Sequence, residues 1–119
     1  MDSILNLSKK LIDWIIGMTE DCPIPYEIRY LYFLIVQDIK GYHLEFGGRE
    51  KKDEVIEYLD YYPLEAQFFI YDYPKSIKEF SLMIEEAFDI AFNNKDFSMI
   101  FENKIVYVSI FRKRISKRL

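Results

Sequence analysis

The clearest hydrophobic pattern along the chain predicts a helix over residues 76–91. Ser76 and Glu79 form a capping box, in which each side chain is expected to satisfy an unpaired backbone N–H at the start of the helix. Apolar residues then recur at steps of three or four, which places them on one helix face. This stripe contains Ile77, Phe80, Ile84, Ala87, Phe88 and Ala91. Asn93 and Asn94 follow, and asparagine is typical of helix ends because it tolerates the left-handed backbone conformation.

A similar pattern predicts a helix over residues 3–18. Its apolar stripe is formed by Ile4, Leu7, Leu11 and Ile15, and is widened by Leu5, Ile12 and Ile16. Trp14 lies beside the stripe and is expected to be half-buried. Pro23 and Pro25 end the helical pattern, because a proline restricts the conformation of the residue before it.

Residues 26–40 carry the features of both a helix and a strand. Pro25 suits the first position of a helix, and Gly41 suits the position that follows its end. The aromatic and β-branched residues of segment 30–36 instead favour a strand. Of these two alternatives we predict a buried helix.

Alternating apolar and polar residues predict a strand over residues 42–46. Tyr42, Leu44 and Phe46 fall on one side of it, and His43 and Glu45 fall on the other. Gly47 and Gly48 are expected to form the turn that closes this strand. A short helix is predicted over residues 53–59, after a charged surface loop.

The same alternation predicts a second strand over residues 64–71. Ala66, Phe68 and Ile70 are expected to face the core, and Glu65, Gln67, Phe69 and Tyr71 are expected to face away from it. Near the end of the chain, the apolar runs 99–102 and 105–111 flank Asn103 and Lys104. That spacing is typical of a β-hairpin.

Together these elements predict a single α+β domain over residues 1–111, with helices packed on a mostly antiparallel sheet of about four strands. Half of the 119 residues are apolar and 18% are aromatic, which is the composition of a folded globular domain. Residues 112–119 are assigned to a basic C-terminal tail. Five of the 16 Lys and Arg residues lie in this tail, whereas all 20 Asp and Glu residues precede it.

No motif in the sequence indicates catalysis, a cofactor or a metal site. His43 and Glu45 suit acid–base chemistry in principle, but no nucleophile or oxyanion signature accompanies them, so a solvated strand face is the better interpretation. One histidine and one cysteine nearly exclude a zinc site. The glycine pair at 47–48 fits no phosphate-binding loop. We therefore predict a protein that is not an enzyme and that has no cofactor.

The charge and hydropathy patterns favour a cytoplasmic protein. The uncharged run 30–37 spans about eight residues, whereas a membrane-spanning helix needs about 20. The chain begins Met1-Asp2, unlike a secretory signal, and its single cysteine, Cys22, has no internal disulfide partner. A net charge of −4 and a pI near 5.0 argue against general binding to nucleic acid. We expect a monomer or homodimer that does not insert into membranes.

The carboxylates and tyrosines between residues 54 and 65 form the predicted partner-binding site. They are Glu54, Glu57, Tyr58, Asp60, Tyr61, Tyr62 and Glu65. Exposed tyrosines supply contact area at low entropic cost, and carboxylates among them suit a basic protein partner. The competing interpretation is an ordinary solvated acidic face, with some of the tyrosines in the core.

A small acidic α+β chain whose middle segment, residues 54–73, is rich in Tyr, Asp and Glu resembles the bacterial immunity proteins of contact-dependent or polymorphic toxin systems. The resemblance lies in the character of the chain and not in a motif, so no residue role is transferred. It implies a protein partner, namely a cognate toxin that is a basic nuclease. Carboxylates would then replace the phosphates that the toxin binds, without direct contact between this chain and nucleic acid.

Two other functions are compatible with the sequence. The basic tail suits a small RNA- or ribosome-associated accessory protein, although a frayed C-terminus explains the same charges, because five cations alone give weak and salt-sensitive binding. An uncharacterised enzyme centred on His43 is the third hypothesis. Nucleic acid that co-purifies with the protein and is lost in salt would distinguish the accessory protein from an immunity protein.

Overall fold

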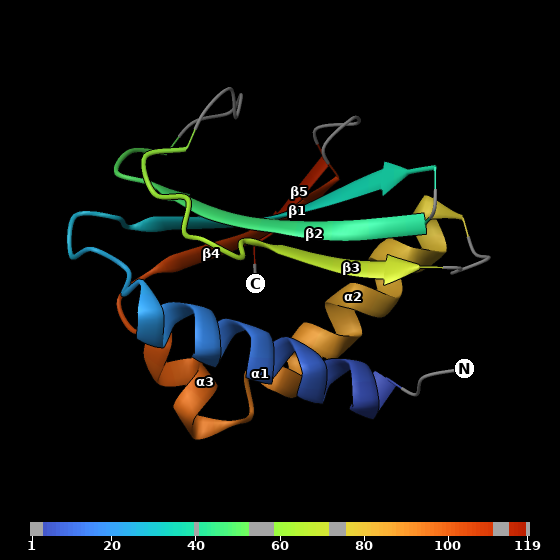
Figure 1. The fold of residues 1–119 in the computed structure, drawn as a ribbon, viewed down its shortest axis with the longest axis horizontal. Coiled ribbons are helices and arrows are strands. Elements are labelled where there is room, and N and C mark those ends of the chain that lie inside the picture. The colour runs from blue at the N-terminus through green and yellow to red at the C-terminus, as the bar shows by residue number, and fades with distance from the viewer. Residues whose placement is uncertain (1–3, 40, 53–58, 72–75, 111–114, 119) are drawn as a thin grey trace.

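The computed structural model describes residues 4–39, 41–52, 59–71, 76–110 and 115–118 (Figure 1). In chain order the elements are α1 (Ile4–Asp21), β1 (Tyr30–Asp38), β2 (Gly41–Arg49), β3 (Gln67–Tyr71), α2 (Ile77–Ala91), α3 (Lys95–Ile100), β4 (Ile105–Ile110) and β5 (Ile115–Arg118). The strands form one sheet, and the three helices lie together on one side of it. This arrangement confirms the predicted α+β fold.

The sheet has the strand order β3-β2-β1-β4-β5. Neighbouring strands are antiparallel except for β1 and β4, which run parallel from Tyr30 opposite Ile105 to Ile35 opposite Ile110. The predicted mostly antiparallel sheet is therefore confirmed. The described residues contain five strands where the sequence suggested about four.

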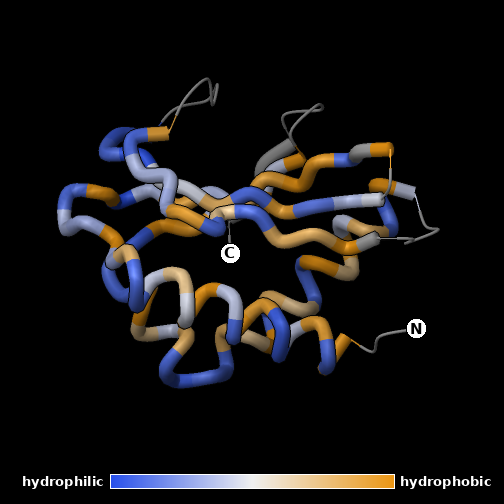
Figure 2. The backbone as a smooth tube through the Cα atoms, in the orientation of Figure 1, coloured by the Kyte–Doolittle hydropathy of each residue, from blue (hydrophilic) through white to orange (hydrophobic). Residues whose placement is uncertain are grey.

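The core lies between the sheet and the helix layer. Its centre is the Phe33 ring of β1, whose centroid is 4.8 Å from that of Phe46 on β2 and 4.4 Å from that of Phe88 on α2. The hydropathy colouring in Figure 2 shows apolar positions recurring along the strands, and polar positions on the outer side of the helices. The side chain of Trp14 on α1 is half-buried, as predicted, and packs against Phe33, Phe46 and Phe68.

Both predicted amphipathic helices are present. In α2 the Ser76 hydroxyl accepts a hydrogen bond from the Glu79 backbone N–H at 3.2 Å, and the predicted stripe from Phe80 to Ala91 is buried. The helix ends as expected before Asn94, whose side chain caps the next helix by accepting from the Phe97 N–H at 3.0 Å. In α1, Leu7, Leu11 and Ile15 of the predicted stripe are buried. Ile4 and Ile12 are partly buried, and Leu5 is exposed rather than part of the stripe.

The prediction of a helix over residues 26–40 is wrong, because most of this segment forms β1. β1 lies in the middle of the sheet between β2 and β4, and both of its faces are buried. On the face away from the helices, the side chains of Tyr32 and Leu34 are only 2% and 5% exposed. A central strand buried on both faces has a continuous apolar sequence without alternation, and such a run does not differ in periodicity from a buried helix.

The turn predicted at Gly47 and Gly48 is also wrong. Both glycines lie within β2, opposite Tyr32 and Leu31 of β1. Gly48 also forms an isolated antiparallel bridge with Tyr61, and the two residues exchange backbone hydrogen bonds at 2.8 and 3.1 Å. The glycines therefore mark a close approach of another segment to the strand, which is the other common reason for glycine in a strand.

The predicted hairpin around Asn103 and Lys104 does not form. Residues 99–102 contribute the end of α3 and the turn after it, and Asn103 adopts a φ of 64° in the connection to β4. The partners of β4 are β1 and β5 instead. The predicted short helix at 53–59 lies almost entirely outside the described residues.

The C-terminal residues differ from the frayed tail expected as one alternative. The backbone of Ile115–Arg118 forms β5 and pairs antiparallel with β4, from Ile110 opposite Ile115 to Tyr107 opposite Arg118. This pairing extends the sheet at the edge opposite β3. Within the residues that the structure describes, no helix has the length and apolar character needed to span a membrane.

Candidate functional site

The sheet face away from the helices carries a group of polar and aromatic side chains on β2 and β3. Strand alternation places His43 and Glu45 of β2 on this face, opposite Phe69 and Gln67 of β3. Tyr62, from the segment that leads into β3, lies beside them because it bonds to Glu45. We call these five residues the β2–β3 outer surface.

Glu45 is the centre of the hydrogen bonding on this surface. Its Oε1 atom accepts from the Tyr62 hydroxyl at 3.1 Å and from Nε2 of Gln67, also at 3.1 Å. Its Oε2 atom lies 3.9 Å from Nε2 of His43, and the His43 ring packs on Phe69 with 5.1 Å between centroids. The carboxylate thus holds side chains from three segments in one arrangement.

The tyrosine in this network remains protonated at neutral pH. Partial burial raises the pKa of Tyr62, and the negative charge of Glu45 and its hydrogen bond add to the increase. A protonated phenol is the form that donates to a carboxylate. The Tyr62 phenol is therefore the donor, and Glu45 the acceptor, in this hydrogen bond at neutral pH.

Three exposed apolar or aromatic side chains lie on or next to this surface. The exposed fractions are 50% for Tyr62, 88% for Leu64 and 45% for Phe69. Aromatic residues with large exposed areas are enriched in protein–protein contacts. The arrangement is suited to binding a protein.

The predicted site residues do not all share this surface. Tyr62 belongs to it, and Glu65 is exposed next to β3 with a φ of 63°, while its carbonyl accepts from the Trp14 indole N–H at 2.8 Å. Asp60 is engaged elsewhere: its Oδ2 accepts from the Glu50 backbone N–H at 2.9 Å and lies 3.5 Å from Nε of Arg49. The other predicted residues Glu54, Glu57 and Tyr58 lie outside the described residues.

Tyr61 belongs to the core and not to a binding surface. Only 5% of it is exposed, its ring meets Phe46 edge-on at 6.1 Å, and its hydroxyl donates to the Cys22 carbonyl at 2.5 Å. Burial is the main cause of a strongly raised pKa of Tyr61. The alternative that some of these tyrosines are core residues is therefore correct for Tyr61.

Tyr61→Phe is expected to lower the free energy of unfolding by about 0.5–1.5 kcal/mol, because it removes one internal hydrogen bond. Tyr62→Phe serves as the control, because that hydroxyl bonds at the surface, and a change within about 0.5 kcal/mol is expected. Urea denaturation of both variants measures the difference. Equal losses would contradict the separate placement of the two hydroxyls.

Tyr61→Phe is also expected to change how the stability of the protein depends on pH. In the unfolded chain a tyrosine ionises near its ordinary pKa of 10.0, whereas folded Tyr61 stays protonated at that pH. Its contribution to stability is therefore complete below pH 10 and is lost as the pH rises further. The alkaline decline in stability should be shallower in Tyr61→Phe than in the wild type.

Five members of this surface region were not among the predicted site residues, namely His43, Glu45, Leu64, Gln67 and Phe69. Of these, His43 and Glu45 were considered only as an acid–base pair. Gln67 and Phe69 were expected to face away from the core, which is correct, but nothing in the sequence linked them to Glu45. Leu64 precedes the strand, and no sequence pattern marks it as a site residue. An aromatic residue on the outward face of a half-buried strand is the signal that identifies Phe69.

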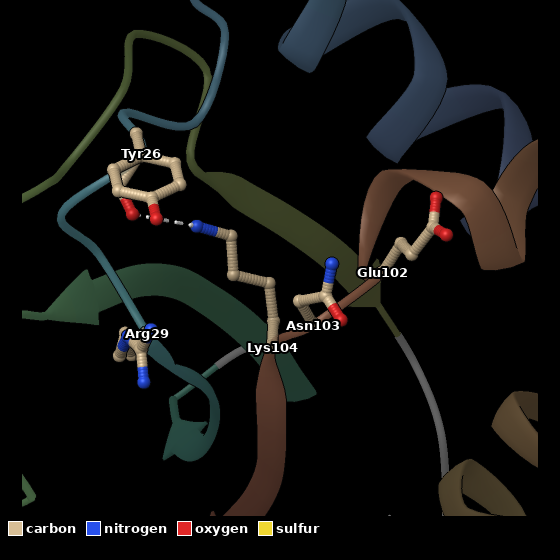
Figure 3. Close-up of a pocket in the computed structure, with 5 residues that line it drawn as sticks. All are labelled: Tyr26, Arg29, Glu102, Asn103 and Lys104. Carbon is tan, nitrogen blue, oxygen red and sulfur yellow. Dashed lines mark hydrogen bonds between the residues drawn. The ribbon is translucent and has the colours of Figure 1, made fainter.

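A separate pocket of about 360 Å³ lies where α3 leads into β4 (Figure 3). Its lining residues are Tyr26, Arg29, Glu102, Asn103 and Lys104. The Lys104 ammonium donates to the backbone carbonyls of Pro25 at 3.2 Å, of Tyr26 at 3.3 Å and of Ile28. Burial, followed by the charge of Arg29, lowers the pKa of Lys104.

The contacts in this pocket hold two segments of the backbone together. Figure 3 shows the Lys104 side chain directed at the backbone of Tyr26, while Arg29 and Glu102 point away from the ammonium. The lysine uses its donors to connect the start of β4 to the segment before β1. The charged groups therefore do not converge on a common point where a ligand would bind.

No group of three or more His, Cys, Asp or Glu side chains in the described part of the chain is placed to hold a metal ion. No protein-family model matches this chain, and neither the curated proteins nor the solved structures compared with it contain a match. The functional argument consequently rests on the surface itself.

Proposed function

We propose that this protein is a non-catalytic binding protein that acts as a bacterial immunity protein and neutralises a basic toxin, with a nuclease as the expected toxin class. The observation that carries the proposal is the β2–β3 outer surface. There the exposed Tyr62 bonds to the carboxylate of Glu45, the exposed ring of Phe69 packs on His43, and exposed Leu64 and Glu65 lie beside them along the chain.

The physical roles of these groups differ. The exposed rings supply apolar contact area, and such anchors dominate the affinity of most protein interfaces. The carboxylates attract a cationic partner and mainly increase the association rate. The network around Glu45 fixes Tyr62 and Gln67 before binding, which reduces the entropic cost of ordering side chains at the interface.

The structure narrows the set of residues in this proposal. Asp60 and Tyr61 have the internal roles described above, so we assign the contacts to Tyr62 and Glu65 from the original set, and to Glu45, Leu64 and Phe69. Glu54, Glu57 and Tyr58 remain predicted contacts on the basis of their sequence alone.

The proposal is tested by co-expression with each toxin candidate encoded next to this gene. Protection of the host from one of these toxins is the expected result, and failure to protect against every candidate would reject the immunity function. The association rate of the purified pair is measured at low and high salt, and it is expected to be higher at low salt.

Charge reversal locates the binding surface. The double variant Glu45→Lys/Glu65→Lys is expected to weaken toxin binding by at least about a hundredfold if the carboxylates are desolvated at the interface. A second double variant, Glu86→Lys/Asp89→Lys, is the control for net charge, because it changes the charge by the same amount and both residues are exposed on α2, in the layer on the other side of the sheet. Equal losses of toxin affinity in the test variant and in the control would show that this surface is not the binding site.

The alternative of an RNA- or ribosome-associated accessory protein depended on a free basic tail. The backbone of residues 115–118 is instead paired with β4. The structure therefore adds no support to the accessory function, and co-purification with salt-sensitive nucleic acid remains its test.

A further inference from the structure

The segment that leads into β3 contains a loop displaced from the sheet. The continuous β2–β3 register, with Glu45 opposite Gln67, would place residue 64 opposite Gly48. Tyr61 pairs with Gly48 instead, so three extra residues lie between the two paired segments. Extra residues in one strand of an antiparallel pair leave the ladder and redirect their side chains. We call residues 62–65 the edge loop.

Backbone hydrogen bonds hold both ends of the edge loop on β2. Before the loop, the Gly48 N–H donates to the Tyr61 carbonyl at 2.8 Å, and the Tyr61 N–H donates to the Gly48 carbonyl at 3.1 Å. After the loop, the Phe46 N–H donates to the Ala66 carbonyl at 2.9 Å. The loop therefore begins and ends at points that are fixed to the same strand.

The edge loop is also bonded to both faces of the sheet. On the outer face the Tyr62 hydroxyl donates to Glu45, and on the helix face the Trp14 indole N–H donates to the Glu65 carbonyl at 2.8 Å. Glu65 adopts a φ of 63°, which is uncommon for a residue other than glycine or asparagine. Such a conformation persists only where surrounding contacts maintain it, and it is frequent at binding sites. The loop is therefore ordered before any partner binds.

Leu64 is the most exposed apolar side chain of this loop. It is 88% exposed, whereas Leu5 on α1 and Leu82 on α2 are 67% and 54% exposed. An apolar side chain on an ordered, displaced loop suits a concave apolar site. Binding then buries the side chain without the entropic cost of ordering the loop.

We propose that the edge loop inserts into the protein partner, with Leu64 filling an apolar pocket that has cationic groups on its rim. Glu65, which is exposed next to Leu64 in the loop, pairs with these cationic groups. An apolar anchor surrounded by polar contacts is the common anatomy of protein interfaces. The identity of the partner as a toxin rests on the proposed function, but the insertion is testable without it.

A small host molecule of the same chemistry tests the loop without a toxin. β-Cyclodextrin has an apolar cavity, and amino groups on its rim add positive charge. Amino-β-cyclodextrin is titrated into the protein with ¹³C-labelled leucine methyl groups, and the Leu64 methyl signals are expected to shift most. Leu5 and Leu82 are internal controls, because they are exposed leucines outside the loop. Equal or larger shifts at either control would overturn the proposal.

Truncation of Leu64 tests the insertion with a toxin that the co-expression experiment identifies. Leu64→Ala is expected to lower the affinity at least about tenfold, because it removes the buried anchor. Leu82→Ala is the matched control, since it removes the same atoms from a helix in the layer on the other side of the sheet, and it should leave the affinity unchanged. Thermal melting checks that both variants fold. Wild-type affinity in folded Leu64→Ala would overturn the insertion.

Two substitutions of Glu65 separate the order of the loop from its charge. Glu65→Asn and Glu65→Gly both remove the charge and tolerate the left-handed conformation, but glycine gives the backbone more freedom. Glu65→Gly is therefore expected to bind the toxin about three- to tenfold more weakly than Glu65→Asn, and to lower the ¹⁵N order parameters of residues 64 and 65. Equal affinities would contradict the role of an ordered loop.

The outcomes separate the insertion from the proposed function. Selective binding of amino-β-cyclodextrin at Leu64, without protection against any toxin, would preserve the edge loop as a binding element and reject only the immunity function. Protection together with unchanged affinity in Leu64→Ala would do the reverse. A doubled mass of the protein alone, with concentration-dependent shifts at Leu64, would show that the pocket belongs to a second copy of the chain and would overturn a separate partner.

Discussion

Replacement of Phe88 by alanine is expected to lower the free energy of unfolding by about 3–5 kcal/mol. Phe88 is fully buried in the middle of the α2 stripe, and its ring contacts Phe33 at 4.4 Å and Phe97 at 6.5 Å between centroids. The substitution removes apolar contact area and leaves a cavity between rigid elements, which relax only partially around it.

Leu82→Ala is the matched control for this experiment. Leu82 lies on the same helix, but more than half of its side chain is exposed, so a change within about 0.5 kcal/mol is expected. Chemical denaturation followed by circular dichroism measures both variants. A Phe88→Ala midpoint equal to that of the wild type would show that the helix packs on the sheet in a different rotation.

The second large effect is expected for Gly47→Ala, with a loss of about 1–3 kcal/mol. A Cβ atom at Gly47 would lie 2.4 Å from Cδ1 of Leu59 and 2.8 Å from the Tyr61 carbonyl oxygen. The Leu59 atom is the end of a flexible side chain, whereas the carbonyl belongs to backbone that is hydrogen-bonded to β2. Relief of the clash therefore requires the whole bridge between Gly48 and Tyr61 to move.

The same substitution should have the opposite effect at Gly17. This glycine lies inside α1, and a Cβ atom there meets no atom within 4 Å. Gly17→Ala is expected to stabilise the protein by about 0.5–1 kcal/mol, because alanine loses less backbone entropy than glycine on entering a helix. Thermal melting of the two variants distinguishes them, and a shift in the same direction would contradict this explanation.

The parts of the fold that the sequence predicted correctly are those with one buried face. The stripe of α2 and the alternation of Tyr42, Leu44 and Phe46 in β2 each repeat with the period of their element, so the pattern specifies both the element and its buried side. β1 is buried on two faces and has no such repeat. Its strand character follows from its position between β2 and β4, which is a long-range property of the fold.

The same reasoning explains why the candidate site was predicted only in part. Tyr61 and Tyr62 are adjacent and identical, yet one is in the core and the other is half-exposed. The bridge between Gly48 and Tyr61 determines that difference, and it joins residues from different parts of the sequence. The sequence alone does not mark Glu45 as a site residue, because the contact with Gln67 forms only when β3 pairs with β2.

The parallel pairing of β1 with β4 has a consequence for the synthesis of this protein. β1, β2 and β3 follow one another along the chain, so this part of the sheet is able to form early through local contacts. The other edge of β1 stays open until residues 105–110 have left the ribosome and closed a long loop. In that interval the apolar sequence of β1 is an unpaired edge, so the nascent chain is most prone to aggregation in the period before β4 pairs with β1.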